Sequence, residues 1–261
     1  MTEVKSVLLE KNNGIATLTM NRPNVLNTLH PDLIAELVAA LNEVENDAAI
    51  KVVILTGAGK AFCAGGDLPY IDELNTPVEG RDYIIKASEI ITTITKMDKP
   101  VIGMINGVAA GAGANLALAC DIVFCAKSAR FGQSFAKVGL IPDCGGTYLL
   151  PRAVGLHKAK ELMFTADLIN ADTALQLGIV NQVVDDSELK EVTYKFAERL
   201  ANSATIALGL MKRVLNQSDS LDLEQVLEIE TGMQCICLQT EDNKEGVKAF
   251  KEKRNPVFKG R

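Results

Sequence analysis

The sequence has little histidine, and this shortage excludes several kinds of active site. Only His30 and His157 occur among the 261 residues. Ser-His-Asp hydrolysis, Cys-His nucleophilic catalysis and histidine-rich metal sites all depend on suitably placed imidazoles. We therefore expect any chemistry to use carboxylates or backbone dipoles, and we expect no metal site.

Long apolar runs and an excess of positive charge are also missing. No uninterrupted apolar stretch approaches the roughly 20 residues that a membrane-spanning helix needs. The formal net charge is -6, from 27 Lys and Arg against 33 Asp and Glu. This balance argues against a general attraction to nucleic acid or anionic lipid. With 48% hydrophobic and 23% charged residues, the composition predicts a soluble globular protein with neither partner.

The six cysteines do not indicate a disulfide framework. A secretion signal, with an apolar segment behind basic residues, is not seen at the N-terminus. A chain of this length can also build a hydrophobic core without cross-links. We therefore expect reduced thiols and a cytoplasmic location.

Hydrophobic spacing alternates between strand and helix through the first half of the chain. The predicted strands cover residues 15–20, 52–55, 101–105 and 121–125. The predicted helices begin at Pro31, span Ile84 to Ile94 before Lys99-Pro100, and begin near Gly111. Because the strands are apolar on both faces, they are typical of a parallel sheet covered by helices.

Beyond Gly132 the strand signals become sparse. Apart from a short run at 179–184, helical patterns cover residues 187–200, 204–217, 221–240 and 245–253. No proline- or serine-rich linker precedes them. We therefore expect an α/β core over residues 1–200 and a helical region over residues 201–261, which packs on this core, on a neighbouring subunit, or on both.

Three glycine-rich stretches are candidates for ligand binding, at residues 63–67, 109–115 and 144–147. They do not fit nucleotide-binding patterns. Gly59-Lys60 lacks the preceding glycine and the following Ser or Thr of a P-loop, and Leu116 occupies the third glycine position of a dinucleotide fingerprint. We therefore expect neither of these nucleotide sites.

A Gly/Ala-rich helix start presents unobstructed backbone N–H groups at the positive end of the helix dipole. The first stretch follows the strand that ends at Leu55, and the second follows the strand that ends at Ile105. If these strands are neighbours in a parallel sheet, both loops lie at its carboxyl edge, where two N–H groups can form an oxyanion hole. The alternative is that the glycines serve only tight turns and close packing.

Four motifs follow one another along the chain: Asn21-Arg22-Pro23 with Leu26-Asn27, then residues 60–67, 106–113 and 139–147. Together with Glu252-Lys253-Arg254 and Phe258-Lys259, they resemble the crotonase (enoyl-CoA hydratase/isomerase) superfamily over nearly the whole chain. The run Ile141-Pro142-Asp143-Cys144 is most similar to the ring-epoxide phenylacetyl-CoA isomerase and enoyl-CoA isomerase group.

The resemblance implies an α/β fold with a ββα spiral core and a C-terminal helical region that forms a trimer or a dimer of trimers. It implies that the N–H groups of Gly66 and Ala112 stabilise a thioester enolate. Coenzyme A would be part of the substrate, and no separate cofactor is implied. The residues implied to contact CoA are Val25, Leu26, Ala64, Gly65, Asp67, Leu68 and Gly111, with Phe258 and Lys259 from the same or an adjacent subunit.

At two positions the chain departs from the family's hydratases. The positions that match their two catalytic glutamates hold Asn115 and Phe135, and neither side chain can act as a general base. Asn115 is instead expected to pair with the backbone. Asp67 is expected to shape the oxyanion turn or to cap the next helix.

Asp143 matches the catalytic aspartate of family members that isomerise or dehalogenate acyl-CoA substrates. Its alternative role is to cap a helix that begins at Cys144. With Phe135 in place of a carboxylate, the pocket should be drier, which raises the pKa of Asp143.

The leading hypothesis is therefore an acyl-CoA isomerase that shifts a double bond or a ring epoxide, in fatty acid or phenylacetate breakdown. The alternatives are an enoyl-CoA hydratase and a non-catalytic CoA-binding protein.

Overall fold

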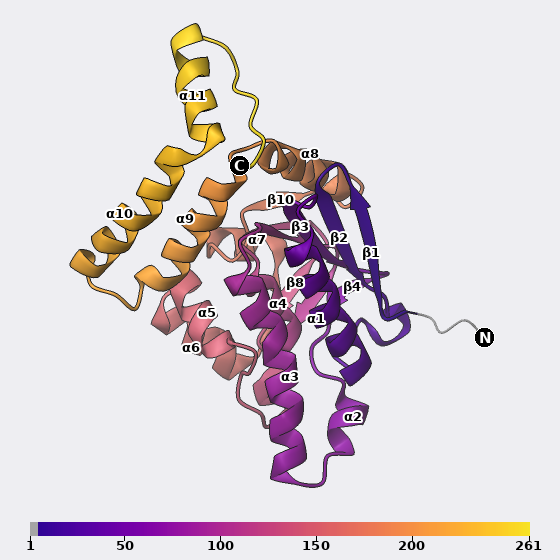
Figure 1. Cartoon of the computed structure of the whole chain (residues 1–261). Coiled ribbons are helices and arrows are strands. Elements are labelled where there is room, and N and C mark those ends of the chain that lie inside the picture. Colours follow the sequence, from indigo (N-terminus) through magenta and orange to yellow (C-terminus); the bar gives the residue numbers. More distant parts are fainter. Residues whose placement is uncertain (1–4) are drawn as a thin grey trace.

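The computed structural model describes residues 5–261, and its core contains two β-sheets surrounded by helices (Figure 1). The larger sheet has the strand order β1 (Val7–Asn12), β2 (Ile15–Met20), β3 (Val52–Gly57), β5 (Val101–Ile105), β7 (Ile122–Ala126) and β10 (Gln182–Val184). Only the β1–β2 pair among these is antiparallel. The expected parallel sheet is therefore confirmed.

The smaller sheet consists of four short strands, β4 (Ala61–Cys63), β6 (Val108–Ala110), β8 (Arg130–Gly132) and β9 (Ile169–Asn170). Each of the first three directly follows a strand of the larger sheet in the chain, and a helix comes next. This repeated order is the ββα pattern that the resemblance implies. The sequence predicts none of these strands, because two or three residues are too few to show a period of two.

The central strands are buried on both faces, as their composition predicts. In β3, Val53 and Leu55 belong to the core beneath α1 (Pro31–Asn46), α3 (Pro77–Lys96) and α4 (Ala112–Ala119). Val52 and Ile54 belong to a second core beneath α8 (Leu189–Ala201). Helices thus cover both sides of the larger sheet.

The predicted helices agree with the structure apart from their ends. The α3 helix stops at Lys96, three residues before Lys99, because Met97 already has extended dihedral angles. The hydrophobic pattern predicts no helix at α2 (Leu68–Asp72), α5 (Gly146–Val154), α6 (Leu156–Thr165) or α7 (Ala171–Gln176), although α2 and α5 follow the positions considered as caps, Asp67 and Asp143. All are short, and α5 also contains Pro151, which obscures a helical pattern.

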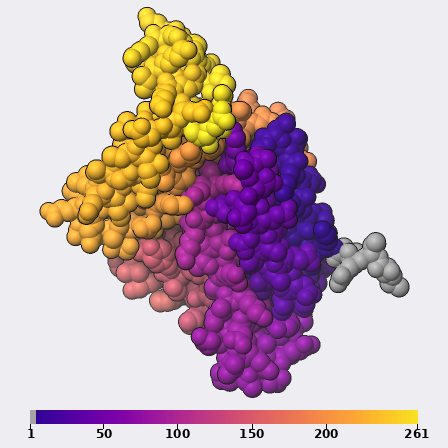
Figure 2. Space-filling view, in the orientation of Figure 1, coloured from indigo at the N-terminus to yellow at the C-terminus, as the bar shows by residue number. Residues whose placement is uncertain are grey.

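The last three helices are α9 (Thr205–Ser218), α10 (Leu223–Gln239) and α11 (Glu241–Glu252). Figure 1 shows them together on one side of the core, with α11 extending away from the sheets, and Figure 2 shows the same segment protruding from the surface. The division of the chain at residue 200 stays a prediction. None of the helices in residues 5–261 combines the length and the apolar character that crossing a membrane requires.

Candidate active site

The first two glycine-rich loops meet beside the sheets. Strands β3 and β5 are parallel neighbours, and so are the strands β4 and β6 that follow them. A Cβ atom on Gly65 would lie 2.8 Å from the carbonyl oxygen of Ala110, and one on Gly113 would lie 2.0 Å from the carbonyl oxygen of Cys63. Only glycine permits this approach. The expected meeting of the loops at one sheet edge is therefore confirmed.

These loops border a cavity of about 390 Å³. Its walls also include residues from α3 and from the segment between β8 and α5. Nine residues predicted for the site line it: Val25, Ala64, Gly65, Gly66, Asp67, Leu68, Gly111, Ala112 and Asp143. Residues that are far apart in the sequence thus face one space of a size suited to a small ligand.

Three other predicted residues do not line this cavity. The Leu26 side chain is exposed beside Val25, and its carbonyl accepts a hydrogen bond from Ala64 N–H at 3.0 Å. Phe258 lies near Gly246 of α11, and the main-chain N–H of Lys259 donates to Asp242 at 2.7 Å. The structure therefore does not place Phe258 and Lys259 with the other predicted CoA contacts of the same chain.

Asp143 lies at the cavity wall with its carboxyl group largely removed from solvent. Its Oδ1 atom is buried and has no hydrogen-bond partner within residues 5–261. Burial raises the pKa of the carboxyl group above its ordinary value, although a hydrogen bond with the Cys144 side chain opposes this change. The predicted direction of the pKa shift is confirmed. A raised pKa makes the carboxylate a stronger base than an ordinary aspartate.

The alternative capping role of Asp143 is wrong. The helix that follows, α5, begins at Gly146, and its N-cap residue is Gly145 rather than Asp143. The main-chain carbonyl of Asp143, not its carboxyl group, accepts the hydrogen bond from Gly146 N–H at 2.9 Å. The side chain is therefore not engaged at the helix start.

Asn115 and Phe135 take up the two positions that match the hydratase glutamates. Asn115 is fully buried on α4, and its Nδ2 donates to the carbonyl oxygen of Asp143 at 2.8 Å. Its Oδ1 accepts a hydrogen bond from Gln133 Nε2 at 2.7 Å. Phe135 is 6% exposed and lines the cavity. The expected pairing of Asn115 with the backbone is confirmed.

Asp67 is the second carboxylate at the cavity, and its oxygens are already bonded. Its Oδ2 accepts hydrogen bonds from Arg22 Nη1 at 2.8 Å and from Thr28 Oγ1 at 2.9 Å. Its Oδ1 caps α2 through Tyr70 N–H at 3.4 Å. Burial by itself would raise the pKa of Asp67, but the bonds from Arg22 and Thr28 outweigh it and the pKa is lowered. Of the two roles predicted for Asp67, the capping of the next helix is confirmed.

Sequence reasoning missed Tyr83 and Gln133. Tyr83 projects from α3 into the cavity wall, and its hydroxyl donates to the carbonyl oxygen of Leu29 at 2.7 Å. A Cβ atom on Gly66 would lie 3.4 Å from this hydroxyl. The only signal for Tyr83 is its place on the apolar face of α3 with Ala87. Gln133 follows a three-residue strand and carries no signal in the sequence.

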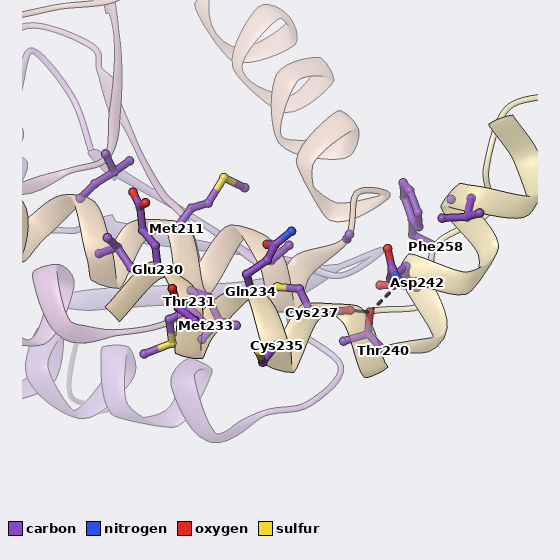
Figure 3. Close-up of a pocket in the computed structure, with 18 of the residues that line it drawn as sticks. Met211, Glu230, Thr231, Met233, Gln234, Cys235, Cys237, Thr240, Asp242 and Phe258 are labelled. Atoms are coloured by element: carbon purple, nitrogen blue, oxygen red, sulfur yellow. Dashed lines mark hydrogen bonds between the residues drawn. The ribbon is translucent and has the colours of Figure 1, made fainter. Parts of the chain in front are cut away.

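A larger hollow of about 1150 Å³ lies between α9, α10, α11 and the C-terminal segment (Figure 3). Apolar side chains such as Met211, Leu215 and Phe250 line much of it. Its carboxylate Asp242 accepts hydrogen bonds from the main-chain N–H groups of Lys259 and Gly260 and so holds the C-terminal segment. The smaller cavity differs in that the carboxyl group of Asp143 holds no main-chain N–H group in this way among the described residues.

Comparison with known proteins agrees with this arrangement. Residues 10–261 match the family described as Enoyl-CoA hydratase/isomerase. The chain belongs to this family. The resemblance seen in the four motifs is therefore confirmed, and so is the crotonase-like α/β fold.

Within residues 5–261, no group of three or more His, Cys, Asp or Glu side chains is placed to hold a metal ion.

Relatives in the family carry out more than one reaction. The chain is 41% identical to the short-chain-enoyl-CoA hydratase of Clostridium acetobutylicum, over 97% of each chain. It is also 41% identical to the 1,2-epoxyphenylacetyl-CoA isomerase of Escherichia coli, over 98% of each chain. A crystal structure of enoyl-CoA hydratase from Bacillus anthracis superposes with a TM-score of 0.94 at 36% identity, over 98% of this chain and 100% of that one.

Proposed function

We propose that this enoyl-CoA hydratase/isomerase family member isomerises acyl-CoA thioesters. The proposal rests on the difference in hydrogen bonding between the two carboxyl groups at the cavity. Asp143 is partly buried there, and its buried Oδ1 has no hydrogen-bond partner among the described residues, whereas Asp67 is bonded to Arg22 and Thr28. A single base is sufficient to move a proton between two carbons, because the same group removes and returns it.

In the proposed reaction, the Asp143 carboxylate removes a proton from C2 of a 3-enoyl thioester. The electron pair of the broken C–H bond delocalises onto the thioester oxygen and forms an enolate. The N–H groups of Gly66 and Ala112 donate to this oxygen, and one such donor typically contributes roughly 3 to 4 kcal/mol of barrier stabilisation. Protonated Asp143 then returns the proton to C4, and the double bond moves to C2–C3.

The surroundings of Asp143 favour isomerisation over hydration. Phe135 presents an apolar ring where hydratases of the family have a carboxylate, and the Asn115 amide is bonded to the Asp143 carbonyl. Neither group can activate a water molecule as a base. The CoA part of the substrate is proposed to lie along Val25 and Leu68, whose side chains are exposed at the cavity's border.

A second candidate function is hydration of a 2-enoyl-CoA, which the similarity to the Clostridium acetobutylicum hydratase favours. Asp143 would then have to act on a water molecule with no second carboxylate at position 115 or 135. The two functions predict different products from different substrates, so one set of assays separates them.

The test compares the wild type with Asp143→Asn on a 3-enoyl-CoA and on crotonyl-CoA. We expect isomerisation to exceed hydration in the wild type, and kcat for isomerisation to fall by about 10² to 10⁴ in Asp143→Asn. The exposed Asp185 forms only a surface ion pair with Lys127, so Asp185→Asn is the matched control and should retain full activity.

Equal isomerisation rates in the wild type and Asp143→Asn would remove the aspartate from the mechanism. Faster hydration than isomerisation would identify a hydratase. Tight binding of acyl-CoA without turnover of any substrate would identify a non-catalytic CoA-binding protein.

We also propose that α9, α10 and α11 join several copies of this chain, as a trimer or a dimer of trimers. Phe250 is 86% exposed and Leu215 is 69% exposed beside the large hollow, and contiguous apolar surface of this kind is typical of an interface. In such an assembly Phe258 and Lys259 could reach the CoA of a neighbouring subunit. A cytoplasmic location and a role in fatty acid or phenylacetate breakdown stay predictions.

A further inference from the structure

Two buried amide side chains form a short hydrogen-bonded chain that ends at Asp143. Gln133 Nε2 donates to Asn115 Oδ1 at 2.7 Å, and Asn115 Nδ2 donates to the Asp143 carbonyl oxygen at 2.8 Å. Asn115 is 0% exposed and Gln133 is 3% exposed. The bond from Gln133 fixes which end of the Asn115 amide faces Asp143, because Oδ1 must point toward the Gln133 donor.

The direction of the Asp143 carboxyl group depends on its main chain and on its hydrogen bond with the Cys144 side chain. Its Oδ1 has no hydrogen-bond partner in the described part of the chain. The main chain just after it is unusual, because Cys144 and Gly145 both have positive φ angles, of 45° and 75°. A non-glycine residue rarely adopts this conformation unless its surroundings hold it there. Asn115 and Gly146 N–H, which both donate to the Asp143 carbonyl, hold this turn.

Asn115 also connects the turn at residues 143–146 to α4, the helix that begins at Ala112. It lies on α4, three residues after Ala112, so it moves with the helix that presents the Ala112 N–H group. The contact is close: a Cβ atom on Gly146 would lie 2.4 Å from Asn115 Nδ2. A single side chain thus sets the distance between the start of α4 and the main chain of Asp143.

The buried side chain of Gln133 indicates that the hydrogen bond from Gln133 to Asn115 does more than fill space. Its Oε1 is buried without a hydrogen-bond partner in residues 5–261, and a buried acceptor left unpaired costs free energy. An apolar side chain of similar size would avoid this cost but could not orient Asn115.

We propose that Asn115, oriented by Gln133, is a positioning residue that holds the Asp143 carboxyl group at the correct place relative to the Ala112 N–H group. The inference rests on the proposed function, because it assigns Asn115 a role that acts through Asp143. Asn115 does not itself exchange protons with the substrate.

The test uses Asn115→Leu, which has nearly the same size but cannot form either hydrogen bond, and Gln133→Leu, which removes only the outer bond. We expect kcat for isomerisation to fall by about 10- to 100-fold in Asn115→Leu and by less in Gln133→Leu, since small displacements of a reacting group have effects of this size. KM should change by less than about threefold, because the cavity lining that binds the substrate is kept.

Two controls separate positioning from general destabilisation. Ile54→Val weakens the second core beneath α8, on the other face of the larger sheet from α4, and should retain wild-type kcat despite its lower stability. The infrared stretch of a bound substrate labelled with ¹³C at the thioester carbonyl reports on the N–H donors, and it should be unchanged in Gln133→Leu.

The decisive measurement places Asn115→Leu in an Asp143→Asn background. If Asn115 acts through Asp143, the second substitution should reduce the residual rate by less than about threefold. A full loss in both backgrounds, or wild-type kcat in folded Asn115→Leu, would overturn the inference. Should Asn115→Leu not fold, Gln133→Leu takes its place in the same comparison. Wild-type activity of Asp143→Asn alone would instead overturn the proposed function.

Discussion

At the scale of single residues, the surroundings of Asp143 determine how the proposed base titrates. Burial raises the pKa of its carboxyl group, and Phe135 is among the apolar side chains that line the same cavity. Asp67 borders the cavity too, but hydrogen bonds from Arg22 and Thr28 lower its pKa. Two aspartates in one cavity are thus shifted in opposite directions, which suits one to proton transfer and the other to structure.

The raised pKa of Asp143 predicts how activity depends on pH. Because the carboxylate form of Asp143 is the base, kcat/KM should fall as the pH decreases through its pKa. The midpoint should lie above 3.8, the ordinary value for an aspartate. Phe135→Ala would admit water to the cavity and should move the midpoint down toward that value. A pH–rate profile of both proteins on one 3-enoyl-CoA measures the effect, and equal midpoints would contradict it.

At the scale of elements, buried polar contacts attach the C-terminal helices to the core. Lys212 of α9 donates to Asp121 Oδ2 at 2.7 Å and to the carbonyl oxygen of Lys99 at 3.1 Å. The Lys212 side chain is only 6% exposed. One residue further along α9, Arg213 pairs with Asp98, but both of these side chains are about half exposed. The same helix therefore offers, for comparison, an ion pair whose lysine is buried and an ion pair in which both partners are exposed.

We expect Lys212→Met to lower the free energy of unfolding by about 1.5 to 3 kcal/mol, because it removes the hydrogen bonds of a buried charged group to Asp121 and to the Lys99 carbonyl. Arg213→Met should cost less than about 1 kcal/mol, since water and ions screen an exposed pair. Urea unfolding followed by circular dichroism measures both values. Similar losses in the two variants would show that burial does not decide the contribution of these pairs.

At the scale of the whole molecule, the distribution of apolar surface distinguishes the two cavities. The smaller one lies between loops of the core, whereas the larger one opens between α9, α10 and α11 (Figure 3). Every residue of α10 keeps part of its surface exposed, including Leu223, which is 72% exposed. Apolar helices with this much free surface need a partner to bury it.

We therefore expect the wild type to be oligomeric and the variant Leu215→Asp with Phe250→Asp to be smaller. A buried interface does not accept two unpaired carboxylates without a large loss of association free energy. Light scattering coupled to size-exclusion chromatography measures the mass of each, and circular dichroism checks that the variant is folded. Asp substitutions at the exposed apolar residues Leu8 and Val78, outside the C-terminal helices, serve as the control. A monomeric wild type would contradict the proposed assembly.

Much of the fold follows from local patterns. Strands β2, β3 and β5 and helices α1 and α3 have enough residues to show their periods, so the sequence predicts them and their parallel arrangement. The short strands β4, β6 and β8 have only three residues each. They exist because each pairs with a strand more than 20 residues away in the chain, and no local pattern records such pairing.

The features of the candidate site also divide into those that the sequence determines and those that only the tertiary structure decides. The sequence by itself determined which chemical groups are available: few imidazoles, three glycine-rich stretches, an aspartate after Pro142, and no carboxylate at positions 115 and 135. Only the tertiary structure decided that Asn115 donates to the carbonyl of a residue 28 positions away, and that Tyr83 reaches Leu29 across 54 positions. It also decided that Phe258 lies beside α11 and not in the cavity of its own chain. Residue types fix what a side chain can donate or accept, whereas the folded backbone fixes which partner it meets.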